Sequence, residues 1–208
     1  MIKANDLSYS FGKDTNLALP NLFCGSGQGL LILGASGSGK TTYLHLLAGL
    51  RKSTSGQVFV DGKEMNKMSD RKLDRFRGRE IGIVFQQAHF IPSLRVKENL
   101  SLSMKLAGKM INKERIRYYL AHLNISHKAN SFPNQLSVGE QQRLSIAMAL
   151  INQPKVVLAD EPTSALDDQN AEQVIGLLKN ETKELNSALV IVTHDQRMKD
   201  HFSNHIHL

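Results

Sequence analysis

A glycine-rich loop between an apolar run and a helical pattern constrains this chain more than any other feature. Residues 34–42 read G-A-S-G-S-G-K-T-T, directly after Leu-Leu-Ile-Leu at 30–33, and a helical pattern follows over 43–50. Glycines at 34, 37 and 39 let the backbone curl so that successive N–H groups point at one anion, and the helix dipole adds to them. This context predicts a phosphate-binding loop rather than a flexible turn, and hence binding of a nucleoside triphosphate.

The side chains of this loop have separate expected parts. Lys40 is expected to reach the β- and γ-phosphates, and the Thr41 hydroxyl is expected to ligate Mg²⁺. The loop residues predicted to contact the nucleotide are Gly34, Ala35, Ser36, Gly37, Ser38, Gly39, Lys40, Thr41 and Thr42.

Three short apolar runs, at 30–33, 156–159 and 188–192, indicate buried strands. Runs without alternation are typical of a parallel sheet covered on both faces, and the helical patterns between them indicate the α/β class. Ligands in such sheets bind at the carboxyl ends of the strands. We therefore expect the phosphate loop, Asp160 and His194 to lie at one edge of the sheet.

The remaining regions have different patterns. Apolar and polar residues alternate in three short segments, 2–11, 17–23 and 57–62, and Gly and Asn residues typical of turns join these segments. This pattern favours an antiparallel β layer near the N-terminus. Residues 86–149 turn helical, with apolar residues at 3–4 spacing over 96–106 and 113–123, and a third helix begins near Ser137. We expect this block to be a helical insertion between a strand ending at Phe85 and a strand starting at Val156.

Composition narrows the class of protein. A chain of 208 residues with 41% hydrophobic residues fits one compact unit with a real core. The net charge of +7 is compatible with nucleic acid, an anionic membrane surface or a nucleotide as partner, and the dense basic stretch at 71–79 fits a solvated helix face.

Cys24 is the single cysteine, and no apolar run approaches the ~18 residues needed to cross a bilayer. With no secretory pattern at the N-terminus, these features predict a cytoplasmic protein.

Two carboxylates end the second apolar run. Residues 155–162 read K-V-V-L-A-D-E-P, so Asp160 and Glu161 follow four apolar residues. Asp160 is expected to hold Mg²⁺ as the acidic partner of Thr41. Glu161 is expected to polarise the attacking water as a general base.

A second candidate anion site precedes the third helix of the helical block. Residues 136–143, the signature segment, read L-S-V-G-E-Q-Q-R. Ser137 and Glu140 have the spacing of a capping box. The same helix start could also bind phosphate, and a partner molecule could bring it over the γ-phosphate held by the first loop.

Together these motifs resemble the nucleotide-binding subunit of an ATP-binding-cassette (ABC) transporter, over nearly the whole chain. The resemblance implies a P-loop NTPase core with a mostly parallel sheet, an N-terminal antiparallel β layer and an inserted helical subdomain. It implies one domain over 1–208, in which 1–86 and 152–208 form the core with its β layer and 87–151 the helical subdomain. The implied cofactors are ATP and Mg²⁺.

Further roles come from this resemblance alone. Gln86 matches the glutamine that senses Mg²⁺ and couples to the membrane partner, and His194 matches the switch histidine at the γ-phosphate. Residues 164–167 match a loop at the dimer contact. Phe11 stands where the family stacks an aromatic ring on adenine, with Tyr9 as the rival. The signature residues implied to contact nucleotide are Ser137, Gly139 and Glu140.

Within the family, residues 68–100 resemble the branch of lipoprotein-releasing, macrolide-export and cell-division ATPases. The resemblance implies an ATP-dependent homodimer on the cytoplasmic face of the membrane, bound to an integral membrane permease. Val138 replaces a signature glycine, so an ordinary backbone conformation is expected there, and Met148 stands where an arginine is usual. The chain is also expected to lack the closing strand of the sheet.

Two rival functions remain at this point. An ABC-type ATPase can act on nucleic acid or ribosomes, but a single cassette without heptads or zinc cysteines argues against it, so no nucleic acid is expected. A regulator that uses ATP binding as a switch would have the same site residues. A small-molecule kinase is disfavoured, because it would not need the signature segment or the pair Glu161 and His194.

Overall fold

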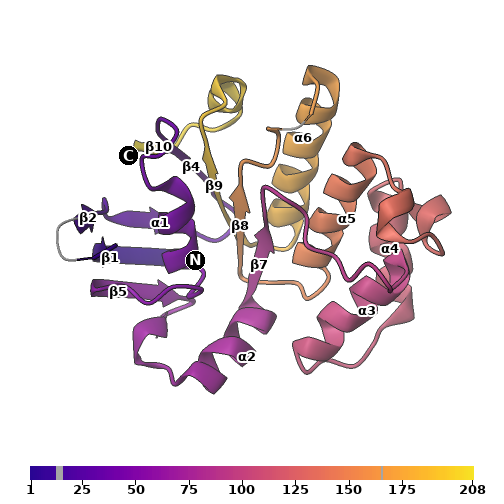
Figure 1. Cartoon of the computed structure of the whole chain (residues 1–208), viewed down its shortest axis with the longest axis horizontal. Helices are drawn as coiled ribbons and strands as arrows, with labels where there is room; N and C mark the ends of the chain where they lie inside the picture. Colours follow the sequence, from indigo (N-terminus) through magenta and orange to yellow (C-terminus); the bar gives the residue numbers. More distant parts are fainter. Residues whose placement is uncertain (13–15, 165) are drawn as a thin grey trace.

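Two sheets form the centre of the molecule (Figure 1). The computed structural model describes residues 1–12, 16–164 and 166–208. One sheet is parallel and lies in the middle of the fold, and the other is antiparallel and lies beside it. The α/β class, the parallel sheet and the separate antiparallel layer predicted from the sequence are confirmed.

The parallel sheet has the order β10-β4-β9-β8-β7. Its strands are β10 (His205–His207), β4 (Gly29–Leu33), β9 (Ala188–Thr193), β8 (Val156–Asp160) and β7 (Ile81–Val84). The three apolar runs became β4, β8 and β9, which are neighbours and almost wholly buried. Because the three strands are parallel, the phosphate loop, Asp160 and His194 all follow carboxyl ends at the same edge, as expected.

The antiparallel sheet is built on one long strand. Its strands are β1 (Ile2–Ser10), β2 (Asn16–Ala18), β3 (Leu22–Cys24), β5 (Ser55–Val60) and β6 (Lys63–Glu64). A single strand over 17–23 was expected, and this was wrong. The chain pairs with β1 twice, as β2 and β3, and Pro20 lies in the gap, where a residue without an N–H cannot donate to the ladder.

Six α-helices surround the parallel sheet in the described part of the chain. They are α1 (Lys40–Leu47), α2 (Asp70–Glu80), α3 (Val96–Leu106), α4 (Lys113–His122), α5 (Val138–Leu150) and α6 (Asp168–Glu184). Short 3₁₀ turns lie at Met65–Lys67, Ser126–Lys128, Pro133–Gln135 and Gln196–His201. The helical block between β7 and β8 contains α3, α4 and α5, as predicted.

The parallel sheet separates two hydrophobic cores. Leu30 and Ile32 of β4 face a core shared with α1 and the antiparallel sheet. Leu31 and Leu33 face a second core, shared with α3, α4, α5 and α6. Figure 1 shows α1 on one side of the sheet and α3 to α6 on the other. The helical block therefore has no separate core among the described residues, and its boundary at 87–151 stays a prediction.

The edge of the parallel sheet contains a strand that the sequence analysis did not predict. The chain was expected to stop at residues 205–208, before a closing strand, and His205–His207 of this last segment pair in parallel with β4. Beyond them, the Leu208 N–H donates to the Leu33 carbonyl at 2.8 Å. Backbone pairing supplies this strand, although its sequence has no long apolar run.

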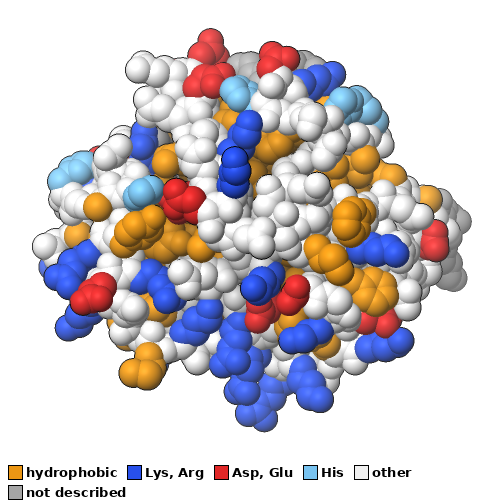
Figure 2. All heavy atoms as spheres, turned by 180° about the vertical axis from the view of Figure 1, so that it is seen from behind, with side chains coloured by type: hydrophobic (Ala, Val, Ile, Leu, Met, Phe, Trp, Pro, Cys, Tyr) orange, Lys and Arg blue, Asp and Glu red, His pale blue; other side chains and the backbone are white. Residues whose placement is uncertain are grey.

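The basic stretch at 71–79 forms most of α2. Leu73 is buried, whereas Arg71, Lys72, Arg75 and Arg79 are exposed. Figure 2 shows Lys and Arg side chains gathered along the lower edge of the molecule, the edge at which α2 lies in Figure 1. This is the expected solvated helix face. None of the helices in the described ranges has the length and apolar character that a membrane span requires.

Candidate nucleotide-binding site

The phosphate loop joins β4 to α1, and its lysine points back into the loop. The Lys40 ammonium donates to the carbonyls of Gly34 and Ala35 at 2.9 Å each, and it lies 3.8 Å from the Glu161 carboxylate. The side chain is only 7% exposed. The buried ammonium of Lys40 is thereby held between the loop backbone and the carboxylate of Glu161.

Two glycines give the loop its curvature. Gly37 and Gly39 have φ values of 81° and 98°, in the left-handed region that side chains disfavour. Gly39 is also the N-cap residue of α1, and no side-chain hydrogen bond caps the start of this helix. The first turn of α1 contains no acidic residue, so its positive end is directed at the loop without a carboxylate of its own.

Asp160 ends β8 beneath this loop. It is 3% exposed, its Oδ1 atom has no hydrogen-bond partner among the described residues, and its carboxyl pairs with the Thr41 side chain. Burial raises the pKa of Asp160, and this effect exceeds the opposing effect of the Thr41 hydrogen bond. A buried, half-satisfied carboxylate beside a hydroxyl is a donor set that fits Mg²⁺.

Glu161 and His194 are in direct contact. The His194 Nδ1 atom lies 2.8 Å from Glu161 Oε1, and the His194 backbone N–H donates to the same oxygen at 3.1 Å. The Thr193 hydroxyl donates to Glu161 Oε2 at 2.8 Å. Glu161 has φ 45°, an unusual conformation for a glutamate, and is 8% exposed, whereas the His194 side chain is 62% exposed. The carboxylate is thus oriented from several sides, and its histidine reaches solvent.

Sequence reasoning missed the part played by Thr193. Its hydroxyl also accepts from the Asp195 backbone N–H at 3.0 Å, and Thr163 donates to Asp195 Oδ2 at 3.0 Å. A polar residue at the end of an apolar run, directly before His194, was the available signal. These contacts join the segments that follow β8 and β9.

A cavity of about 310 Å³, the nucleotide cavity, opens at this edge. Residues from the β1 end, the phosphate loop, the β7 end and the β8 and β9 ends meet there. Its lining comprises Phe11, Ser36, Gly37, Gly39, Lys40, Thr41, Thr42, Gln86, Glu161 and His194. The structure therefore brings most of the predicted site residues to one place.

Phe11 and Tyr9 differ in their surroundings. Phe11 is 54% exposed and lines the nucleotide cavity. Tyr9 packs its ring edge-on against Phe11 at 4.9 Å, and its hydroxyl accepts a hydrogen bond from Arg51 at 3.0 Å. Tyr9 is thus occupied by Arg51, and Phe11 presents the freer ring face. Adenine stacking stays a prediction for Phe11.

The signature segment lies apart from the nucleotide cavity. Ser137, Gly139 and Glu140 do not line it, and α5 lies across the parallel sheet from α1 (Figure 1). The expected capping box is present. The Ser137 N–H donates to Glu140 Oε2 at 2.8 Å, and the Glu140 N–H donates to Ser137 Oγ at 3.4 Å. Within one chain, the two predicted phosphate-binding elements do not meet.

Comparison with known proteins places these motifs in a family. The family model described as "ABC transporter" matches residues 18–164, well over half of the chain. The chain belongs to the ABC transporter family. This ABC chain is therefore an ATP-binding and ATP-hydrolysing subunit, and an action on nucleic acid or ribosomes is not favoured.

Individual relatives and structures agree with this assignment. The lipoprotein-releasing system ATP-binding protein LolD of Idiomarina loihiensis is 39% identical, over 90% of this chain and 81% of its own length. An ABC transporter ATP-binding protein of Methanocaldococcus jannaschii, MJ0796, is 41% identical over 94% of this chain and 87% of its own length. The solved dimer of the MJ0796 cassette with ADP and Pi, described as a post-hydrolysis state, matches with a TM-score of 0.90 and 35% identity. It covers all of this chain and 94% of the solved one.

Two departures from the family pattern fit this ABC fold. Val138 is the first residue of α5 and has no positive φ, so its β-branched side chain needs no strained backbone. It is 58% exposed. Met148 packs, partly buried, against the core shared by α3 to α6. Of the expected dimer-contact loop, Ala165 lies outside the described residues.

Proposed function

We propose that two copies of this chain close around two ATP molecules and that hydrolysis reopens them. In each site the phosphate loop of one copy would face Ser137, Gly139 and Glu140 of the other. One observation carries this proposal: the two phosphate-binding elements belong to opposite sides of the parallel sheet. A second copy related by a two-fold axis is the simplest way to bring them together.

The residues of the nucleotide cavity have distinct proposed tasks in hydrolysis. Lys40 would leave the loop carbonyls to bind the β- and γ-phosphates. Glu161 would accept a proton from the attacking water, and the hydrogen bonds from Thr193 and His194 hold its carboxylate in place. His194 is exposed on the cavity wall and would contact the γ-phosphate.

The metal ligands are proposed on the same basis. Thr41, Asp160 and Gln86 would hold Mg²⁺, because all three offer hard oxygen donors. The Thr41 hydroxyl and the Gln86 amide line the nucleotide cavity, and the buried Asp160 carboxylate bonds Thr41 and keeps one oxygen without a hydrogen-bond partner among the described residues. When bound, Mg²⁺ neutralises charge on the phosphates during transfer. Asp160 is buried at an energetic cost, which a cation would offset.

We further propose that the dimer drives a separate integral membrane permease from the cytoplasmic face. The helical subdomain, residues 87–151, would pass the motion of the dimer to that permease, and Gln86 would couple the subdomain to the nucleotide. The similarity to LolD supports a permease of the export or lipoprotein-releasing type. No nucleic-acid partner is expected.

A Glu161→Gln variant tests the dimer directly. This change keeps shape and removes the base, so turnover should fall by ~10²–10⁴ while ATP remains bound. Sedimentation with ATP and Mg²⁺ should then show a dimer. Glu172→Gln is the matched control, because Glu172 also pairs with a histidine, His201, but lies on the exposed surface of α6. A Glu161→Gln protein that stays monomeric and hydrolyses ATP at the original rate would contradict the proposal.

The permease is tested separately. Tagged Glu161→Gln protein with ATP and Mg²⁺ is used to isolate partners from detergent-solubilised membranes. Recovery of a stoichiometric integral membrane protein is the expected result. Recovery of ribosomal or nucleic-acid-associated proteins alone would overturn the transport function while leaving the dimer intact.

A further inference from the structure

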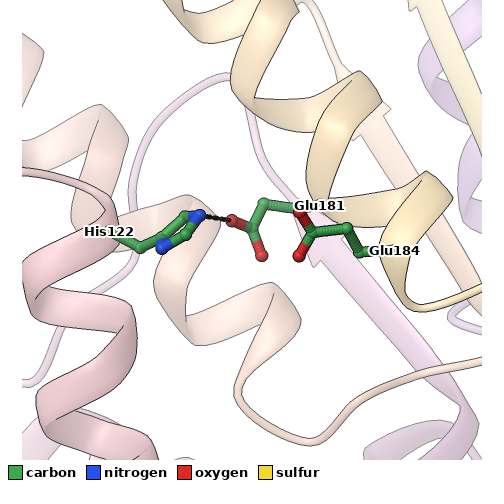
Figure 3. A group of neighbouring side chains, drawn as sticks. All are labelled: His122, Glu181 and Glu184. Atoms are coloured by element: carbon green, nitrogen blue, oxygen red, sulfur yellow. Dashed lines mark ion pairs between the residues drawn. The ribbon is translucent and has the colours of Figure 1, made fainter.

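Three metal-ligating side chains converge where α4 meets α6, away from the nucleotide cavity. His122 ends α4, and Glu181 and Glu184 lie on the last turns of α6 (Figure 3). The His122 Nε2 atom lies 3.3 Å from Glu181 Oε1. One ligand atom from each of the three side chains lies within 4.8 Å of the others. Figure 3 shows His122 pointing across the helix contact toward the two carboxylates.

The charge at this place is unbalanced. Glu181 is 2% exposed, yet in the described part of the chain its ion pairs comprise His122 alone. Glu184 adds a second carboxyl group beside the one imidazole, so the cluster contains more acidic groups than basic ones. Burial raises the pKa of Glu181, His122 opposes this, and Glu184 reinforces it. A cation bound beside Glu181 would therefore stabilise its buried carboxylate, which has His122 on one side and a second acidic group, Glu184, on the other.

The histidine is held in position for a ligand. The Tyr118 ring, one turn earlier on α4, stacks on the His122 ring at 4.9 Å with an interplanar angle of 25°. The His122 side chain is 45% exposed and Glu184 is exposed, so an ion can enter from solvent and reach the buried Glu181. Two ligand atoms on one tetrahedral zinc ion lie about 3.3 Å apart, given bonds of about 2.0–2.1 Å. The His122–Glu181 separation already has this value.

We propose that His122, Glu181 and Glu184 bind a transition-metal dication of the zinc type, with water completing the coordination. An imidazole with two carboxylates suits zinc, whereas magnesium and calcium prefer oxygen donors alone. The ion would join α4, in the helical block, to α6, which follows β8. It would therefore fasten the block to the rest of the fold without touching the nucleotide cavity.

Metal titration of tag-free, chelator-treated protein tests this site in the absence of nucleotide. Isothermal titration with Zn²⁺ should show one ion per chain at this site, and Co²⁺ should give the visible absorption of a four- or five-coordinate complex. His122→Ala and Glu184→Gln should each weaken binding by at least roughly tenfold, since loss of groups outside the coordination sphere already costs about 10–100-fold. Zn²⁺ should raise the unfolding midpoint of the wild type and not that of His122→Ala.

Matched variants separate this site from other histidines. His201 pairs with Glu172 at 3.1 Å, which is the same kind of contact, and among the described residues no third metal-ligating side chain joins this pair. His201→Ala should therefore leave zinc affinity unchanged. His205 and His207 stand 5.5 Å apart on β10 and are replaced together by alanine as a second control. His122 and Glu184 are exposed, so their variants should fold, and circular dichroism checks this.

The opposite pattern would overturn the site. Undiminished zinc binding in both His122→Ala and Glu184→Gln would do so, as would loss of binding only in the His205→Ala/His207→Ala protein. A wild type without measurable Zn²⁺ or Co²⁺ binding would also reject the proposal. None of these results bears on the ATP-dependent dimer, which is measured separately.

Discussion

The two helix starts predicted to bind phosphate differ in how their polar groups are satisfied. At α1, Gly39 provides no side-chain cap, and the buried Ser38 Oγ and Asp160 Oδ1 atoms have no partner among the described residues. At α5, Ser137 and Glu140 cap each other, and His127 and Lys128 lie 3.0 Å and 3.5 Å from the Glu140 carboxylate. The first site is incomplete without a ligand, whereas the second is complete within one chain.

This difference teaches how one chain can carry two phosphate elements. Burial raises the pKa of Glu140, but the hydrogen bonds from Ser137 and His127, with Lys128, outweigh it, so the net pKa is lowered. Glu140 is therefore an anion at the positive end of α5, and it compensates that end until a partner arrives. Substitutions at the α1 start should change nucleotide binding most, and those at the α5 start should change folding stability and dimer formation.

Lys40→Met should produce the largest effect of the variants that probe this comparison. It removes hydrogen bonds to charged phosphates, worth about 1.5–3 kcal/mol, so ATP affinity should fall roughly tenfold to a hundredfold. Equilibrium dialysis with labelled ATP measures this. Lys179→Met is the control, because its ammonium donates to the His201 carbonyl far from the loop, and it should bind ATP normally. Equal ATP affinity in Lys40→Met and Lys179→Met would contradict the claim that the start of α1 binds the nucleotide.

Ser137→Ala should lower stability. Loss of an N-cap hydroxyl costs about 1 kcal/mol in the free energy of unfolding, measured by urea titration. The control, Ser101→Ala, removes a hydroxyl that bonds the Lys97 carbonyl within α3 and caps nothing, so its loss should be smaller. ATP affinity of the monomer should be unchanged in both. A Ser137→Ala protein as stable as the wild type would show that the α5 start is not self-satisfied.

Asp160→Asn should raise stability slightly in the absence of nucleotide and Mg²⁺. Because burial raises the folded pKa of Asp160, the native state binds more protons than the unfolded chain between the ordinary aspartate pKa, about 4, and the raised value. The contribution of Asp160 to the free energy of unfolding therefore falls as pH rises through this window. The variant should gain about 0.5–1 kcal/mol at neutral pH and less at acidic pH.

Urea titrations at several pH values measure this difference. Asp74→Asn, on the exposed face of α2 beside Arg77, is the control and should show no gain. A loss of stability in Asp160→Asn at neutral pH, with nucleotide and metal absent, would contradict the idea that this carboxylate is held ready for a cation at a cost.

Sequence reasoning succeeded where local pattern and topology agree. The buried apolar runs that precede the phosphate loop, Asp160 and His194 predicted strands of a parallel sheet, and parallel strands place their carboxyl ends at one edge. The Ser137–Glu140 spacing likewise predicted a cap that forms within one turn.

It failed where the contact depends on packing between distant segments. The strand at His205–His207 exists because β4 offers it a backbone ladder, not because its own residues are apolar. The contact of Thr193 with Glu161 depends on the register of β8 and β9, and the His122–Glu181 contact depends on how α4 meets α6. None of these partners is near in sequence, so no local pattern indicates them.

The most direct measurement of the central claim is a mixing experiment on two defective chains, both with Glu161→Gln. One chain carries Lys40→Met, and the other carries Gly139→Asp, which fits the backbone since an added Cβ at Gly139 meets only Asn170 Oδ1, at 3.8 Å. The carboxylate that Gly139→Asp introduces should repel the phosphates of ATP. If each ATP site combines one chain's loop with the other chain's signature segment, only the mixed pair contains an intact site. Sedimentation with ATP should show dimers in the mixture and monomers for each chain alone; no dimer in the mixture, or dimers of either chain alone, would contradict the account.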